Sequence, residues 1–252
     1  MSIATACPVT ATRAAWRVPS ARSQTSGNIT TLSPCRGVPT CRPARAVRVA
    51  AHSTMAPDKI IIVPGNGSGD VRSSNWYGWM EAKLLSKGYK VALEDMPDPV
   101  RARENKWVPF IVSTLAGGPK ELEQCLVVGH SSGAAAAMRL AETHRLYGMV
   151  LVAAYTSDLG DQLEAQSGYF SRPWQWEKQA ANAGCIVQLA STDDPFLPIE
   201  EQRKVGLQGL KDRCKYVEKD GRSHWFNPCK ELMEEVEWAI ENGGGANPAT
   251  AS

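Results

Sequence analysis

A serine lies at the centre of the run from Gly129 to Gly133, which has the pattern G-x-S-x-G. The apolar run 125–128 comes directly before it, and an alanine-rich segment of helical composition, 134–140, follows. In this pattern, the glycines permit a sharp turn between strand and helix that exposes the serine hydroxyl above a sheet. The pattern and its context predict that Ser131 is the nucleophile of an acyl-transfer reaction.

A serine hydroxyl is a weak nucleophile unless a base lies beside it. The chain has four histidines. His52 lies in an arginine-rich N-terminal segment, His130 inside the serine motif and His144 at the far end of the following helix. We therefore predict that His224, which follows the last expected strand, is the general base.

A carboxylate is needed to orient the imidazole and to stabilise its cationic form. Asp193 and Asp194 lie in the run 191–195, shortly after the expected strand 185–189, at the place in the chain order Ser, Asp, His where such an acid occurs. The spacing favours Asp194, which lies next to the turn-forming Pro195, but it does not exclude Asp193.

The negative charge that develops on an acyl substrate needs backbone N–H donors. We expect one donor from Ser132, directly after the nucleophile, and a second from the glycine-rich loop 64–69 after the first strand, with Asn66 as the candidate. These two residues would form the oxyanion hole.

The same loop supports a rival interpretation. Gly65 and Gly67 after a strand, with Glu94 or Asp95 at the end of the next, resemble part of a dinucleotide-binding fingerprint, but the sixth position is Asp70 rather than a small residue. A second rival is a catalytically silent interaction protein on a hydrolase scaffold, because a fold does not fix a function.

Short β-branched runs alternate with segments of helical period, which is typical of a parallel sheet covered on both faces. The expected strands are 59–63, 89–93, 125–128, 149–153, 185–189 and 215–218. The expected helices are 76–85, 102–115, 134–140, 199–210 and 231–240. The aromatic-rich stretch between Tyr155 and Gln188 is too long for a single connection, and we interpret it as a small cap over the carboxyl edge of the sheet.

The first 54 residues have a composition of their own, with seven arginines, 14 serines and threonines, and no acidic residue. Such composition is typical of a transit peptide and predicts import into a chloroplast or, alternatively, a mitochondrion. The other interpretation is a disordered tail that stays attached. Use of Met55 as the start would give a cytosolic form. The domain boundaries expected are therefore a leader over 1–54, a hydrolase domain over 55–243 and a flexible tail over 244–252.

Without the leader, 21 Lys and Arg residues stand against 26 Asp and Glu residues, a net charge of about −5. This acidic body argues against nucleic-acid binding.

No apolar run is long enough for a membrane span, so we expect a soluble protein. The cysteines outside the leader, at 125, 185, 214 and 229, have neither metal-site nor disulfide spacing. We expect no metal and no cofactor.

Several longer blocks carry a resemblance. These are 63–67, 76–79, 96–99, 129–133, 153–160, 172–176 and 191–198. Together they resemble the retinoblastoma-binding protein 9 family of small serine hydrolases, from Ile60 to about Ile240. The resemblance implies a compact α/β-hydrolase with a mostly parallel six-stranded sheet, and a triad of Ser131, Asp194 and His224.

The chain departs from this family in two places. Ser223 precedes His224 where the family usually has glycine, and the L-x-C-x-E motif linked to retinoblastoma-protein binding is absent near residues 120–125. Binding of that partner is therefore not expected.

Aromatic residues predict the kind of substrate. A pocket for a small apolar acyl or amino-acyl group would suit an esterase or amidase. The alternative, which is favoured for any single aromatic, is that it is part of the core. The candidates for its lining are Trp76, Phe170, Trp174, Trp176 and Trp225.

Overall fold

Six strands form one sheet in a computed structural model that describes residues 56–244. The order is β2-β1-β3-β4-β5-β6, and every neighbouring pair is parallel. The strands are β1 (Lys59–Val63), β2 (Val91–Ala92), β3 (Cys125–His130), β4 (Gly148–Val152), β5 (Ile186–Ser191) and β6 (Lys215–Lys219). The predicted leader, and the predicted tail beyond Gly244, lie outside the described residues.

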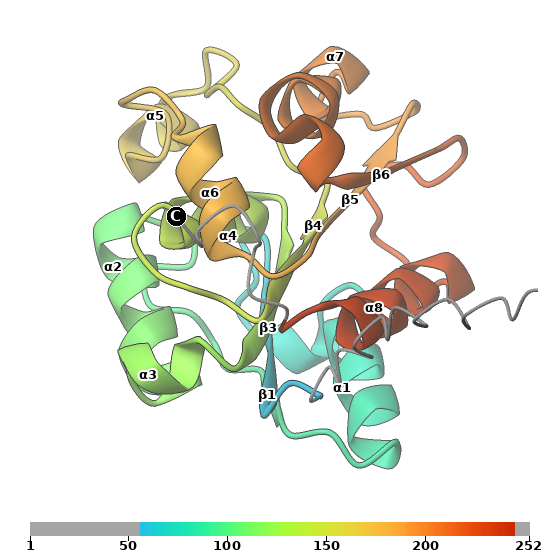
Figure 1. Cartoon of the computed structure of the whole chain (residues 1–252). Coiled ribbons are helices and arrows are strands. Elements are labelled where there is room, and N and C mark those ends of the chain that lie inside the picture. The colour runs from blue at the N-terminus through green and yellow to red at the C-terminus, as the bar shows by residue number, and fades with distance from the viewer. Residues whose placement is uncertain (1–55, 245–252) are drawn as a thin grey trace, which may run out of the picture. The chain divides into compact units, whose positions relative to one another are not determined.

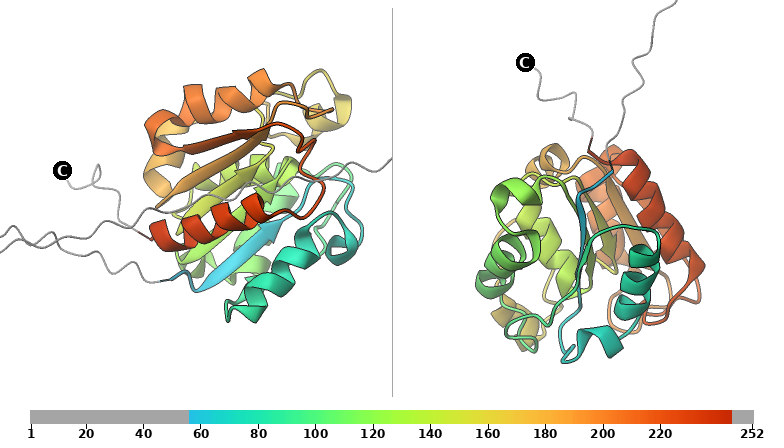
Figure 2. Two further views of the ribbon diagram at one scale, coloured as in Figure 1. Left: turned by 90° about the vertical axis from the view of Figure 1, so that its right-hand side faces the viewer. Right: turned by 90° about the horizontal axis from the view of Figure 1, so that it is seen from below.

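Helices cover both faces of the sheet (Figures 1 and 2). One face packs on α1 (Tyr77–Ser86) and α8 (Lys230–Asn242), and the other on α2 (Glu104–Phe110), α3 (Pro119–Leu122) and α4 (Ser132–Ala141). The remaining helical segments are η1 (Val71–Ser73), η2 (Ile111–Ala116), α5 (Gln162–Ser167), α6 (Trp176–Asn182), α7 (Ile199–Arg203), η3 (Lys204–Leu210) and η4 (Lys211–Arg213). This confirms the predicted α/β fold.

The central strand β3 is buried along its whole length. Its side chains alternate, so that Val127 packs into the core on the α4 face while Leu126 and Val128 pack into the core on the α8 face. A strand buried on both faces must be apolar at successive positions, which explains the uninterrupted run that precedes the serine motif.

Two predicted helices change their geometry part-way. The segment 104–116 is α-helical up to Phe110 and π-helical over η2, and the segment 199–210 is α-helical up to Arg203 and π-helical over η3. In the first case, Pro109 lies within α2 and has no N–H to donate to the preceding turn, which favours a local change of hydrogen-bonding pattern.

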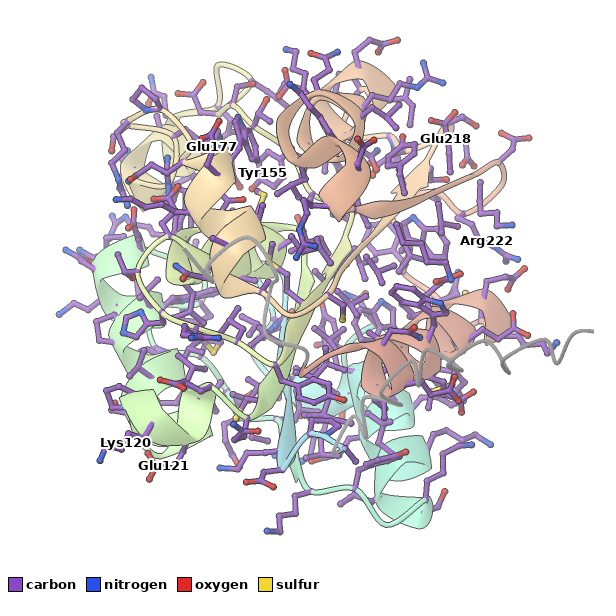
Figure 3. The ribbon with its side chains drawn as sticks, in the orientation of Figure 1. Lys120, Glu121, Tyr155, Glu177, Glu218 and Arg222 are labelled. Atoms are coloured by element: carbon purple, nitrogen blue, oxygen red, sulfur yellow. The ribbon has the colours of Figure 1, made fainter. Side chains whose placement is uncertain are left out.

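The predicted cap divides into two parts. Helix α5 borders the cavity described below, whereas the aromatic stretch that follows it packs against the core on the α4 face. Exposed charged residues such as Lys120, Glu121 and Glu177 lie at the surface (Figure 3). Within residues 56–244, no helix is long and apolar enough to cross a membrane.

A buried arginine ties the aromatic stretch to α4. The guanidinium group of Arg139 has no solvent exposure and forms an ion pair with Glu142, at 2.6 Å. It also donates hydrogen bonds to the carbonyl oxygens of Tyr169, Arg172 and Pro173. The centroid of the Trp174 ring lies 3.7 Å from Cζ of Arg139. Five planar donors suit this arrangement of several carbonyls and one carboxylate.

Replacement of Arg139 by methionine would remove the closer cation of the buried Glu142 carboxylate and leave only the partly exposed Arg172, at 3.7 Å. We expect Arg139→Met to lower the free energy of unfolding by about 3–5 kcal/mol, measured by urea denaturation. The control is Arg145→Met, in which the exposed Arg145 lies near the same helix and the change should stay within about 0.5 kcal/mol. Equal losses in the two variants would contradict the anchoring role.

Candidate active site

Ser131 lies on the turn between β3 and α4, with φ of 55° and ψ of −119°. A positive φ is unfavourable for a residue with a side chain and persists only where the surroundings enforce it. The turn places Ser131 in the lining of a cavity of about 440 Å³. Strand, strained turn and helix thus occur as the sequence pattern predicted.

Close packing explains the two glycines of the motif. A Cβ atom on Gly129 would lie 2.3 Å from the carbonyl oxygen of Gly133. A Cβ atom on Gly133 would lie 2.3 Å from the carbonyl oxygen of Val63, at the end of β1. Both distances are far below van der Waals contact, so the turn requires glycine at both positions.

His224 and Asp194 meet at the edge of the same cavity. The distance from Nδ1 of His224 to Oδ2 of Asp194 is 2.8 Å, and the Asp194 side chain has no solvent exposure. The other carboxylate oxygen of Asp194 accepts hydrogen bonds from the N–H groups of Phe196 and Leu197, at 2.9 and 3.1 Å. These bonds fix the carboxylate and leave Nε2 of His224 available for a reacting group.

Ser131 and His224 both line the cavity, but no direct hydrogen bond between them occurs in the described part of the chain. In enzymes without substrate, such contacts are often long and shorten only when a substrate binds.

Asp193 has a different set of contacts from Asp194. Its Oδ1 accepts hydrogen bonds from the Ser191 hydroxyl, at 2.6 Å, and from the N–H groups of Arg222 and Ser223, at 3.1 and 3.0 Å. These bonds lower the pKa of Asp193, with the Ser191 hydroxyl as the largest cause. Asp193 therefore holds the backbone that leads into His224, and Asp194 contacts the imidazole itself.

Asn66 and Ser132 come from the two segments expected to supply the oxyanion donors. Asn66 follows β1 and lines the cavity, and Ser132 is the first residue of α4. Within residues 56–244, neither backbone N–H has a protein acceptor. No protein group thus occupies either donor, but Ser132 is fully buried and only Asn66 lines the cavity, and their role as an oxyanion hole stays a prediction.

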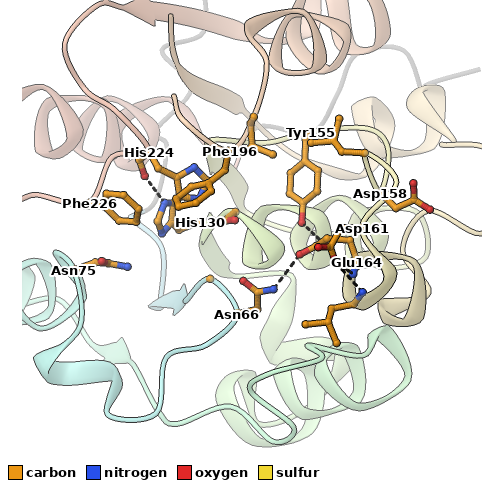
Figure 4. A pocket seen from close by; sticks show the side chains of 15 residues that line it. Asn66, Asn75, His130, Tyr155, Asp158, Asp161, Glu164, Phe196, His224 and Phe226 are labelled. Carbon is orange, nitrogen blue, oxygen red and sulfur yellow. Dashed lines mark hydrogen bonds between the residues drawn. The ribbon is translucent and has the colours of Figure 1, made fainter. Parts of the chain in front are cut away.

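The cavity wall combines carboxylates with apolar side chains, and it contains no lysine or arginine among the described residues (Figure 4). The acidic members are Asp158, Asp161 and Glu164. The apolar members are Leu159, Leu163, Phe196, Leu197 and Phe226. Groups of three or more His, Cys, Asp or Glu side chains that could hold a metal ion are absent from the described residues.

The predicted aromatic lining is wrong for this cavity. Trp76 and Trp225 are at most 1% exposed and belong to the core on the α8 face. Trp174 and Trp176 are partly buried against the core on the α4 face, Phe170 packs against both cores, and none of the five lines the cavity. Large aromatic side chains gain most from complete burial, so their clustering in the sequence reflects the core.

Comparison with known proteins decides the family. The profile of the family described as "Serine hydrolase" matches residues 60–211. The serine hydrolase RBBP9 of Rattus norvegicus is 54% identical over 151 residues, which cover 60% of this chain and 79% of the rat protein. The chain belongs to this serine hydrolase family.

Solved structures agree on the fold of this serine hydrolase. The ydeN gene product of B. subtilis has a TM-score of 0.63 at 21% identity, covering 73% of this chain and 99% of the other. A monoacylglycerol lipase of Paleococcus ferrophilus has a TM-score of 0.52 at 19% identity, covering 75% and 96%. At this level of identity the likeness concerns the α/β-hydrolase fold.

A buried polar chain that sequence analysis missed supports the histidine of this serine hydrolase. The Nε2 atom of His130 lies 2.8 Å from the carbonyl oxygen of His224, and Nδ1 lies 2.6 Å from the hydroxyl of Tyr77. A carbonyl only accepts, so Nε2 carries the proton and Nδ1 accepts from Tyr77. The Tyr77 oxygen in turn accepts from the N–H of Gly65, at 2.9 Å. These hydrogen bonds connect the loop after β1 to the backbone of His224.

This series of hydrogen bonds requires a neutral His130. Burial, followed by the nearby His224, lowers the pKa of His130 to about 3. The unfolded chain binds a proton on this residue below about pH 6.5, so between these values the unfolded state holds more protons than the folded one. The free energy of unfolding must therefore fall as the pH falls.

We expect the wild-type protein to lose up to about 1.4 kcal/mol per pH unit from this residue between about pH 6.5 and about pH 4. His130→Gln has no such titration, so its stability should depend less steeply on pH. Urea denaturation at a series of pH values measures both slopes. Identical slopes would show that His130 is not held neutral by the fold.

The loop around His224 is strained on both sides. Ser223 has a φ of 51° and Trp225 a φ of 53°. The family resemblance predicts glycine at the first of these positions, where a left-handed backbone costs glycine nothing.

Ser223→Gly removes this conformational cost of about 1–2 kcal/mol but adds freedom to the unfolded chain. We expect a net gain in the free energy of unfolding of about 0.5–1 kcal/mol, with kcat retained, because the Ser223 N–H that bonds Asp193 is kept. Thermal and urea denaturation test this, with Ser223→Ala as the control that keeps the strain. A loss of stability in the glycine variant would exclude strain at this position.

Proposed function

We propose that this enzyme hydrolyses small esters or amides through an acyl-enzyme on Ser131, with His224 as general base and Asp194 as its orienting acid. The observation that carries the proposal is the 2.8 Å contact between Asp194 and Nδ1 of His224, at the cavity that Ser131 also lines. Because Nδ1 faces the carboxylate, Nε2 is the atom that can exchange a proton with the serine and the leaving group.

The reaction has two halves. Ser131 Oγ attacks the substrate carbonyl carbon and gives its proton to His224, and the tetrahedral intermediate places its oxyanion near the N–H groups of Asn66 and Ser132. His224 then protonates the leaving alcohol or amine, and the acyl group stays on Ser131. A water molecule, deprotonated by His224, attacks the acyl carbon. The bond to Ser131 Oγ then breaks as His224 returns the proton to that oxygen, and the acid is released.

The cavity favours substrates without negative charge. Asp158, Asp161 and Glu164 line it, and no cationic side chain of the described residues does. An anionic substrate would be repelled, whereas a neutral or cationic ester or amide would not. Leu159, Leu163 and Phe196 offer apolar contacts to its acyl or leaving group.

The proposal predicts a covalent adduct on one serine. A fluorophosphonate probe should label wild-type protein on Ser131, located by mass spectrometry, and labelling should be lost in Ser131→Ala and strongly slowed in His224→Ala. Ester hydrolysis by Ser131→Ala should fall by about four to six orders of magnitude in kcat. Absence of an adduct on folded wild-type protein would overturn the proposal.

The two neighbouring aspartates provide a matched pair of variants. Asp194→Asn should lower kcat by about three to four orders of magnitude, because an amide stabilises neither the needed tautomer nor the imidazolium. Asp193→Asn keeps an acceptor for Ser191 and for the backbone before His224, so its loss should be far smaller. The reverse order would show that Asp194 is not the orienting acid.

A further inference from the structure

We propose that Glu164 is a positioning residue, which holds the oxyanion loop in place through the side chain of Asn66. The inference rests on the function proposed above and extends it to α5. Docking of α5 against the loop after β1 would then be part of the assembled active site rather than only a wall of the cavity.

Both oxygens of the Glu164 carboxylate are used (Figure 4). Oε1 accepts a hydrogen bond from Nδ2 of Asn66, at 2.9 Å. Oε2 accepts a hydrogen bond from the hydroxyl of Tyr155, at 2.6 Å. The Tyr155 hydroxyl also lies 3.5 Å from Oγ of Ser132. One carboxylate is thus connected to the two residues whose N–H groups we assign to the oxyanion hole.

The loop that carries Asn66 has hydrogen bonds from the N–H of Gly65 to Tyr77 and from the N–H of Gly67 to Pro99, so the side chain of Asn66 adds a third point of attachment between them. The loop contains Gly65, Gly67 and Gly69, and Gly67 has a φ of 80°. Three glycines within five residues leave many backbone conformations accessible. An oxyanion donor is effective only when it is held in position before the reaction. The side-chain amide of Asn66 fixes the residue whose backbone N–H would face the oxyanion.

The electrostatic setting of Glu164 fits a role as acceptor. Burial is the main cause that raises its pKa, with smaller contributions from Asp161 and Asp158, while the donors Tyr155 and Asn66 act in the opposite direction. The two donors therefore offset part of the cost of keeping a carboxylate at this site. Among the acidic residues of the cavity lining, Glu164 is the one that bonds Asn66 directly and is connected to Ser132 through Tyr155.

The contact can be broken and rebuilt with polar side chains. Asn66→Asp places two carboxylates within hydrogen-bonding distance, and like charges so close repel each other. We expect kcat to fall by about 10- to 100-fold, with KM changed much less, because a misplaced donor acts on the transition state. Glu164→Gln alone should cost little, because the Asn66 amide can turn and accept from the new amide.

The double variant Asn66→Asp with Glu164→Gln is the decisive measurement. The glutamine oxygen still accepts from Tyr155, and its NH₂ donates to the new aspartate, so we expect kcat to return to within about threefold of Glu164→Gln. Glu164→Leu, which removes both acceptors, should lose about 10-fold or more in kcat. Glu177→Leu, at an exposed site on α6, is the matched control and should behave as wild type (Figure 3).

Two substrates separate positioning from substrate binding. With neutral p-nitrophenyl acetate the effects should appear in kcat, and with cationic glycine p-nitrophenyl ester the same kcat effects should recur. Glu164 would be a substrate-binding residue if Glu164→Leu raised KM for the cationic ester alone while Asn66→Asp lost no kcat. That result would overturn the proposal. Failure of the double variant to recover kcat would also overturn it.

Labelling of Ser131 by the fluorophosphonate distinguishes failure of the role of Glu164 from failure of the proposed function. If wild-type protein carries the adduct and Glu164→Leu hydrolyses the neutral ester as fast as wild type, only the role of Glu164 fails. If wild-type protein carries no adduct, the catalytic proposal fails first.

Discussion

Everything at this site depends on the strained turn at Ser131. Its positive φ is enforced because β1, β3 and α4 approach one another so closely that two glycines are required, at 129 and 133. The energy that maintains the strain comes from the buried strand before the turn and the fully buried helix after it. The same packing brings the end of β1, with its glycine-rich loop, beside the nucleophile.

The other elements of the site are held mainly by polar contacts to the backbone. Asp193 binds the N–H groups before His224, His130 binds the carbonyl of His224, and Asp194 accepts from two N–H groups of its own loop. Each of these side chains lies at or near the carboxyl end of a parallel strand. Parallel strands end at one edge, so residues far apart in sequence converge there.

The segment after β4 forms one wall of the cavity and is secured from two sides. Arg139 and Glu142 bind its aromatic part from α4, and Glu164 binds Tyr155 and Asn66 from α5. Phe170, Trp174 and Trp176 therefore pack against the core, whereas the cavity is lined by carboxylates and by a few aliphatic and phenyl side chains. The charge preference that we propose for the substrate rests on that lining and not on the tryptophans.

The sequence by itself determined the order of the six strands, five of the helices, the nucleophile motif and the family resemblance, because these depend on local periodicity and on residues adjacent in the chain. It did not predict the short helices α3, α5 and α6. Asp194 was favoured over Asp193 only by its proline neighbour and by the resemblance, and the structure separates their contacts. The aromatic lining was wrong, because burial of a tryptophan depends on which elements pack around it. The contacts of Glu164, Tyr155 and His130 were invisible for the same reason: hydrogen bonds between residues up to 98 positions apart exist only once the sheet has brought the strand ends together.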